Sequence, residues 1–308
     1  MLLGRKLKWD RKRRMEDAGM WENILMAAPL LCLAGGAMVS AEEPKAGAVG
    51  LSNAFFAMDT GTRDAQHETV ASQAAMLKEL GYAGIGWTAF DQLPELLKEL
   101  DARNLKLFTL YLGLNIEPDN EKFDPKFKES LPLLKGRDVI LWITVTSNAY
   151  KPSSPEGDPR AVEVIRRIAD EARPYGVRIA LYPHITAWLE RVEDAVRVAK
   201  EVDRDNVGAT FNLYHCLVKD GPKDLEARLE KAMPVLFLVT INGSSPEGSI
   251  ETLDHGAFDL CALLKTLQKL GYTRPIGLQG YGIGGDVHEN LKRSIEAWRG
   301  LCKRAGGV

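Results

Sequence analysis

Short apolar runs alternate with amphipathic segments from about residue 48 to the end of the chain. Between the runs, apolar residues recur at intervals of three and four, as in residues 69–80, 161–176 and 258–272, which predicts helices. The apolar runs are short and rich in β-branched and aromatic residues, which predicts strands. They lie at residues 49–56, 82–87, 105–114, 139–146, 177–183, 207–214, 235–243 and 275–282.

This alternation predicts an α/β fold, a (β/α)8 TIM barrel with eight strands and eight helices. The strands are apolar at almost every position, which is typical of parallel strands covered by helices. Several helical segments end in glycine with a strand directly behind, as in "ELGYAG", "RPYGVR" and "KLGYTR". A doubly wound open sheet is the competing architecture, but no GxGxxG follows the first strand.

The first 41 residues differ from the rest of the chain. A basic segment is followed by an apolar run at residues 24–39 and by small residues, the order of a secretory signal peptide with cleavage before Glu42. The apolar run is shorter than the roughly 20 residues of a membrane span. We therefore expect residues 1–41 to be a leader, residues 42–308 to form one barrel domain, and the protein to be exported to the periplasm or beyond. An uncleaved membrane anchor is the alternative.

Composition limits the kind of partner. The formal net charge of −2 over 308 residues provides no field for nucleic acid or an anionic membrane, so a small neutral ligand fits better. Apart from Cys32 in the leader, three cysteines remain without a CxxC pair, and they indicate neither a disulfide framework nor a zinc site. No pattern in the sequence indicates the oligomeric state.

Active sites of such barrels lie at the carboxyl ends of the strands. In this chain those ends are polar, rich in amides and aromatics, and nearly free of carboxylates. The glycine-rich residues 280–285 lie where barrels often bind phosphate, although tight turns explain them equally well. The candidate site residues are Trp87, Tyr182, His184, Asn212, His215, Asn242, Gln279 and Tyr281.

The segments "LYPH", "FNLYH" and "LDHGAFDLCALLKTLQKLGYTRPIGLQ" resemble the xylose isomerase-like barrel superfamily, the sugar phosphate isomerases and epimerases. The resemblance implies a divalent metal held mainly by carboxylates on strands five, six and eight, and two glutamates that move a proton. At the matching positions this chain has Tyr182, Asn212 and Gln279, and Asn242 lies near the family's histidine on strand seven. These neutral replacements predict that no metal cofactor is needed, although weak binding of Zn, Mn or Mg is left open.

Two functions remain open at this point. In the first, the protein is an exported isomerase, epimerase or related lyase that transfers a proton next to the carbonyl of a sugar or keto-sugar. His184 or His215 would be the base and Tyr182 the acid, while Asn212, Asn242 and Gln279 would hold hydroxyls. Trp87 and Tyr281 would contact the sugar ring. In the second, the protein is a non-catalytic carbohydrate-binding barrel that has lost the metal site.

Overall fold

The computed structural model describes residues 51–118, 122–245 and 248–306. The predicted leader, residues 1–41, lies outside the described residues. Within them, eight parallel strands close into a barrel in the order β1-β10-β7-β6-β5-β4-β3-β2, which follows the chain around the ring. The predicted TIM barrel is therefore confirmed. The barrel strands are β1 (Phe55–Met58), β2 (Gly84–Trp87), β3 (Lys106–Asn115), β4 (Ile140–Thr146), β5 (Arg178–Leu181), β6 (Val207–Asn212), β7 (Leu236–Ile241) and β10 (Ile276–Leu278).

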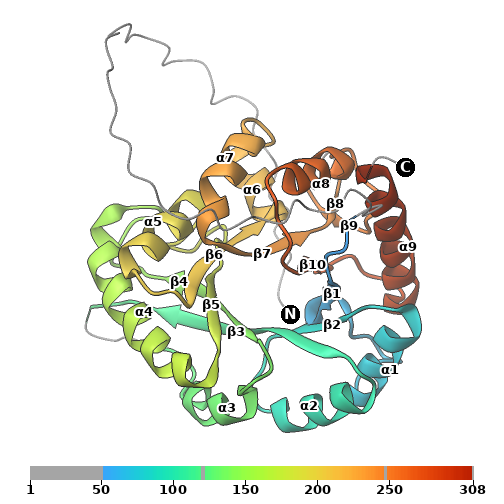
Figure 1. Ribbon diagram of the computed structural model, residues 1–308, viewed down its shortest axis with the longest axis horizontal. Coiled ribbons are helices and arrows are strands. Elements are labelled where there is room, and N and C mark those ends of the chain that lie inside the picture. Colours follow the sequence, from blue (N-terminus) through green and yellow to red (C-terminus); the bar gives the residue numbers. More distant parts are fainter. Residues whose placement is uncertain (1–50, 119–121, 246–247, 307–308) are drawn as a thin grey trace, which may run out of the picture. The chain divides into compact units, whose positions relative to one another are not determined.

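Helices surround the barrel (Figure 1). One helix follows most strands, as predicted, but two short helices lie between β6 and β7. A small hairpin, β8 (Gly243–Ser244) and β9 (Ile250–Glu251), follows β7. The helices are α1 (Val70–Leu80), α2 (Leu93–Ala102), α3 (Lys126–Leu134), α4 (Asp158–Ala172), α5 (Val192–Val202), α6 (Leu213–Asp220), α7 (Leu225–Ala232), α8 (Leu260–Lys269) and α9 (Val287–Ala305).

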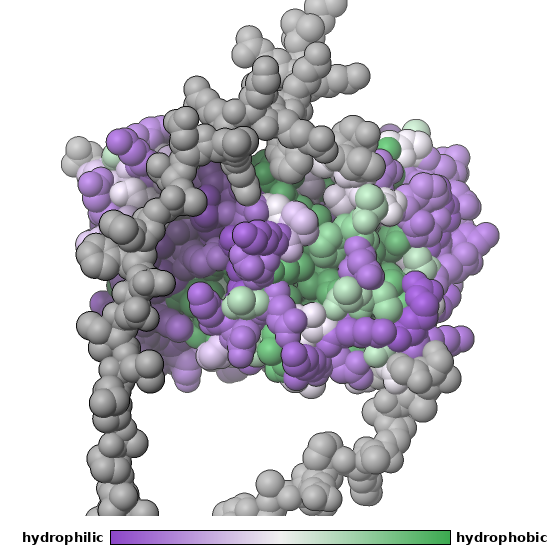
Figure 2. Space-filling model, turned by 90° about the horizontal axis from the view of Figure 1, so that it is seen from above, coloured by the Kyte–Doolittle hydropathy of each residue, from purple (hydrophilic) through white to green (hydrophobic). Residues whose placement is uncertain are grey.

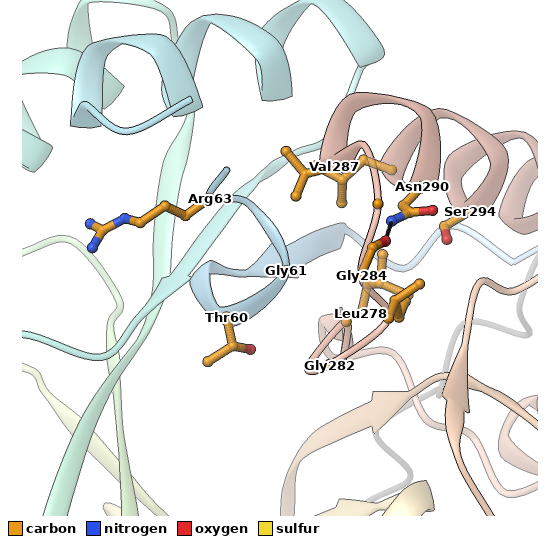
Figure 3. A pocket seen from close by; sticks show the side chains of 13 residues that line it. Thr60, Gly61, Arg63, Leu278, Gly282, Gly284, Val287, Asn290 and Ser294 are labelled. Carbon is orange, nitrogen blue, oxygen red and sulfur yellow. Dashed lines mark hydrogen bonds between the residues drawn. The ribbon is translucent and has the colours of Figure 1, made fainter. Parts of the chain in front are cut away.

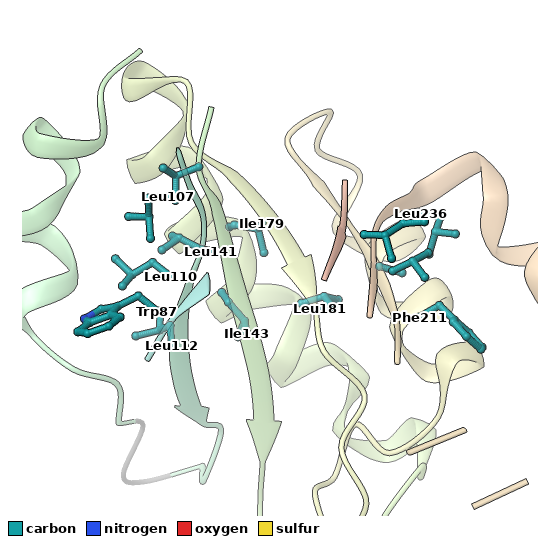
Figure 4. Close-up of a cluster of buried hydrophobic side chains, with 14 of the residues drawn as sticks. Trp87, Leu107, Leu110, Leu112, Leu141, Ile143, Ile179, Leu181, Phe211 and Leu236 are labelled. Atoms are coloured by element: carbon teal, nitrogen blue, oxygen red, sulfur yellow. The ribbon is translucent and has the colours of Figure 1, made fainter. Parts of the chain in front are cut away.

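Both faces of the strands are buried, so two separate cores form. The outer core lies between the strands and the helices and includes Leu110, Ile143 and Leu181 (Figure 4). The inner core fills the barrel with side chains that include Phe56, Phe108, Ile140, Trp142, Tyr182 and Phe237. Since side chains fill the barrel, a ligand site must lie at one of its ends.

Gly208 in β6 makes room for the inner core. A Cβ at this position would lie 2.4 Å from the carbonyl oxygen of Val235 and 2.6 Å from the ring of Phe237. Both distances are shorter than van der Waals contact, so the phenyl ring occupies the space of the missing side chain. Gly208 therefore lets Phe237 of β7 pack inside the barrel.

Hydrophilic side chains cover much of the face seen in Figure 2, with apolar ones between them. Among the described residues only two large hydrophobic side chains are exposed, Leu133 and Tyr281. None of the helices in this part of the chain is both long and apolar enough to cross a bilayer.

Candidate functional site

A cavity of about 580 Å³ opens at the carboxyl ends of the barrel strands. Its wall receives side chains from β1, β3 and β4 and from the segments that directly follow β1, β2, β5, β6 and β10, and Ile250 of the β8–β9 hairpin contributes one side. Ligand pockets commonly measure about 300–1,000 Å³, so the space suits a small organic molecule.

The wall of this cavity is aromatic and uncharged. Among the described residues that line it, none is Lys, Arg, Asp or Glu; the other polar side chains belong to threonines, histidines and Gln279. A charged ligand would have no partner of opposite charge to offset its desolvation. The aromatic lining residues are Tyr111, Trp142, Tyr182, Tyr214 and Tyr281.

Two neighbouring strands position the histidines. Tyr182 and His184 follow the last residue of β5, and the backbone N–H of Tyr182 still bonds to the carbonyl of Ile143 in β4, at 2.7 Å. His215 lies in the first turn of α6 and not in a strand-end loop as the sequence predicted. The reason is Asn212, whose Oδ1 accepts the backbone N–H of His215 at 2.9 Å and caps the helix.

Tyr182, His184 and His215 form a compact cluster in the floor of the cavity. The phenol oxygen of Tyr182 lies 2.7 Å from Nε2 of His215. The two imidazole rings have centroids 4.2 Å apart, and the ring of Trp142 stacks on Tyr182 with centroids 3.7 Å apart. Because the ends of β5 and β6 lie side by side, the three predicted catalytic side chains Tyr182, His184 and His215 are within reach of one ligand.

Burial keeps this cluster uncharged at neutral pH. Burial, together with the proximity of His184, lowers the pKa of His215 to about 3. Burial also lowers the pKa of His184, although the hydrogen bond to the carbonyl of Ile185 raises it in part. The pKa of Tyr182 is raised, chiefly by burial. All three side chains are therefore neutral near pH 7, and each imidazole carries one proton.

The hydrogen bonds assign these protons. Nδ1 of His184 lies 2.6 Å from the carbonyl oxygen of Ile185, which only accepts, so Nδ1 carries the proton and Nε2 has a free lone pair. Nδ1 of His215 receives the backbone N–H of Ile185 at 3.4 Å and is therefore unprotonated. The proton of His215 then lies on Nε2 and is donated to the oxygen of Tyr182. The hydroxyl proton of Tyr182 is left free for a ligand.

Two further predicted residues line the same cavity. Gln279 directly follows β10, and its Oε1 is buried without a hydrogen-bond partner among the described residues. Tyr281 stands in the glycine-rich loop at the rim with 66% of its surface exposed. A buried polar group without a partner is costly, so of the described lining groups the amide of Gln279 is the one with an unmet hydrogen bond.

Trp87, Asn212 and Asn242 do not line the cavity. The side chain of Trp87 is only 1% exposed and lies in the outer core, beside Leu110 and Leu112 (Figure 4). Asn212 is used within the fold: besides capping α6, its Nδ2 donates to Oγ1 of Thr240 at 2.8 Å. Asn242 is fully buried, and its Nδ2 donates to the carbonyl of Gly243.

Other lining residues were not among the sequence candidates. Trp142 lies within β4. Tyr214 lies in the first turn of α6, where the sequence predicted the end of a strand. Tyr111 lies within β3, four residues before that strand ends. Trp142 alternates with residues of the outer core along its strand, but both faces of this strand are apolar, so the sequence carried no signal for its inward side chain.

The glycine-rich loop forms one side of a second cavity, of about 220 Å³, beside the start of α9. The first turn of α9 is already satisfied by carboxylates: Asp64 accepts the N–H of Val287 and Asp286 that of Glu289. Figure 3 shows Arg63 directed away from this loop. Two carboxylates at the helix start oppose an anion, so the cavity does not suit the phosphate that this position holds in many barrels.

A hard divalent cation does not fit the side chains at the barrel mouth. It requires anionic oxygen ligands, but Asn212 is occupied by bonds within the fold, and Tyr182 and His215 are bonded to each other. In the described ranges no group of three or more His, Cys, Asp or Glu side chains is placed to hold a metal. Two imidazoles alone would hold zinc only weakly.

Comparisons with known proteins agree with this architecture. Inosose isomerase of Bacillus licheniformis is 23% identical over 237 residues, which cover 70% of this chain and 84% of that protein. The structure of D-allulose 3-epimerase from Methylomonas sp. in complex with D-allulose superposes with a TM-score of 0.65 at 16% identity, covering 82% of this chain and 99% of that one. A Mycobacterium smegmatis barrel solved with magnesium has a TM-score of 0.62 at 17% identity, covering 82% and 98%.

The family model described as xylose isomerase-like TIM barrel matches residues 74–301. This range begins within α1 and ends within α9, so it includes seven of the eight barrel strands and every residue of the histidine cluster. The chain belongs to the xylose isomerase-like TIM barrel family.

Proposed function

We propose that this protein transfers a proton at the carbon next to the carbonyl of an uncharged sugar or keto-sugar. The observation that carries the proposal is the free Nε2 lone pair of His184, a neutral base in the wall of an uncharged cavity. The relatives named inosose isomerase and D-allulose 3-epimerase act, by their names, on uncharged polyhydroxy ketones, which supports this class of substrate. Isomerisation, epimerisation and elimination all begin with such a step.

The cavity provides partners for the rest of such a ligand. The unpartnered Oε1 of Gln279 accepts a hydroxyl, and Tyr281 offers an aromatic face to the C–H side of a sugar ring. The lack of charge on the wall favours a free sugar or a glycoside over a sugar phosphate. The signal-like residues 1–41 support export, where unphosphorylated sugars are the expected substrates.

Proton exchange in heavy water tests the proposal. The protein is incubated with D-allulose, an inosose and a methyl 3-keto-glucoside, and proton NMR follows exchange at the carbons beside each carbonyl. We expect exchange with at least one probe, and a 100-fold or greater loss in His184→Asn, because removing a general base commonly costs 10²–10⁴-fold. The asparagine amide keeps a donor near the position of Nδ1, so the bond to Ile185 is retained. His255→Asn, on the exposed surface, is the matched control.

The alternative is a carbohydrate-binding barrel without catalysis, which the same uncharged and aromatic wall would serve. Calorimetric titration with the same probes distinguishes the two. Binding without exchange at any carbon would replace the catalytic proposal by the binding one, and the absence of both binding and exchange would contradict each.

A further inference from the structure

We propose that the hydroxyl of Tyr182, held by His215, polarises the substrate carbonyl in place of the family's metal ion. The inference rests on the proposed function and names the group that stabilises the negative charge on the substrate oxygen when His184 removes the proton. Tyr182 lines the cavity, and its phenol oxygen lies 2.7 Å from Nε2 of His215. The ring centroids of Tyr182 and His184 are 5.7 Å apart, so the base and the donor are within reach of adjacent substrate carbons.

The direction of the hydrogen bond decides what the phenol can do. If Tyr182 donated its proton to His215, it would have none to offer a ligand. The backbone N–H of Ile185 directed at Nδ1 of His215 places the imidazole proton on Nε2 instead. Tyr182 then accepts from His215 and donates into the cavity, and in the described residues no other acceptor takes that proton. Accepting one hydrogen bond also strengthens the donor capacity of the same hydroxyl.

The step balances without a further reactant. Nε2 of His184 takes the proton from the carbon beside the carbonyl, and the C–H bonding pair forms a carbon–carbon double bond. The carbonyl π pair moves onto oxygen, where the O–H of Tyr182 stabilises the negative charge, while His184 becomes an imidazolium. A donor of this kind in a dry site commonly contributes 10²–10³ to the rate. Return of the proton from Nε2 of His184 to the same carbon reforms the C–H bond and the carbonyl, and both side chains are back in their starting state.

His215 acts through Tyr182 and is a positioning residue. Among the described residues its two ring nitrogens are bonded to the phenol and to the N–H of Ile185, and Asn212 fixes its backbone at the start of α6. Stacking of Trp142 holds the plane of the phenol from the other side. The pair is therefore oriented before any substrate arrives, which is the condition for effective electrostatic stabilisation.

Nitrogen-15 NMR of the full chain labelled at histidine reads the proton positions directly. The sequence has five histidines, and the variants His184→Asn and His215→Gln assign the two signals of interest. We expect His215 to be protonated at Nε2 and His184 at Nδ1, and the Nε2–H signal of His215 to shift in Tyr182→Phe. A proton on Nδ1 of His215 would overturn the inference, whether or not the protein is an enzyme.

The rate of exchange tests the role in catalysis on the probe that the unmodified protein turns over. Tyr182→Phe should lower kcat 10²–10³-fold and change KM by less than about threefold, since the lost bond strengthens only as charge develops. Tyr175→Phe, in the short turn before β5, is the matched control and should keep the full rate. His215→Gln keeps an N–H near the position of Nε2 and should lose less activity than His215→Leu.

The outcomes separate this inference from the proposed function. If the unmodified protein exchanges no probe, the proposed function fails and the role of Tyr182 fails with it. Exchange that persists at full rate in Tyr182→Phe overturns the inference alone. So does exchange that EDTA abolishes and added Mg²⁺ or Zn²⁺ restores, because a metal would then be polarising the carbonyl.

Discussion

Lowering the pH from 7 to 5 should destabilise the barrel because His215 becomes protonated. The variant His215→Gln should lose less unfolding free energy over the same pH interval than the unmodified protein. His215 is 4% exposed, bonded to a phenol and next to a second histidine. Among the residues that the structure describes, no anionic side chain lines the cavity that it faces. Protonation therefore places an unpaired charge in a buried site, which the folded state resists and the unfolded chain does not.

The size of the effect follows from the pKa of the two states. An unfolded histidine has a pKa near 6.5, and in the fold that of His215 is lowered to about 3. Stability from a lowered pKa is fully present above the unfolded value and is lost as the pH falls toward the folded one. Each pH unit in that window costs about 1.4 kcal/mol, so a fall from pH 7 to pH 5 removes about 2 kcal/mol. The interval from pH 7 to pH 5 lies above the range in which most carboxylates titrate.

Chemical denaturation followed by tryptophan fluorescence at both pH values measures this loss. The unmodified protein should lose about 2 kcal/mol more than His215→Gln between pH 7 and pH 5, since glutamine keeps a donor to Tyr182 and does not titrate. His184 contributes in the same direction to both proteins and cancels in the difference. His288→Gln on α9 controls for the substitution itself. Equal losses in the unmodified protein and His215→Gln would refute the claim that His215 is buried in its neutral form.

Three further results are expected. Asn212→Ala removes both the cap of α6 and the bond to Thr240, and should lower the free energy of unfolding by about 1–2 kcal/mol. Thermal or chemical denaturation measures this loss, and an unchanged stability would contradict the capping role. Mass spectrometry of protein recovered from the periplasm or medium should find a chain that begins at Glu42, and an intact leader in the exported protein would exclude cleavage there. Protein purified without chelator or affinity tag should contain far less than one divalent metal per chain, and only Asn212→Asp combined with Gln279→Glu should gain it; stoichiometric metal in the unmodified protein would refute this.

The sequence predicted the barrel because its pattern is repeated. Each strand must be apolar on both faces and each helix on one, so errors at single boundaries do not change the number of strands. The first strand was placed too early, at residues 49–56, because the run is apolar, whereas β1 begins at Phe55. Asn53 instead lies before the strand and donates to the backbone carbonyls of Tyr272 and Arg274.

The same double burial explains what the sequence did not reveal about the site. When both faces of a strand are apolar, composition does not indicate which side chains point into the barrel, so Trp87 was expected at the ligand although it faces the helices. Asn212 and His215 were read as the polar end of a strand. A spacing of three also separates a helix-capping side chain from the residue whose backbone N–H it accepts. Asn212 is used in this way, so only His215 of the pair lines the cavity.

The cap at Asn212 bears on how such barrels change their chemistry during evolution. Aspartate and asparagine cap helices about equally well, so the turn from β6 to α6 places no strong selection on the choice between them. With aspartate there, Thr240 would donate its hydroxyl proton to the side chain and no longer receive one from it. A lineage can therefore exchange a charged for a neutral side chain at this position without first losing the fold, and selection on the reaction alone decides which one is kept.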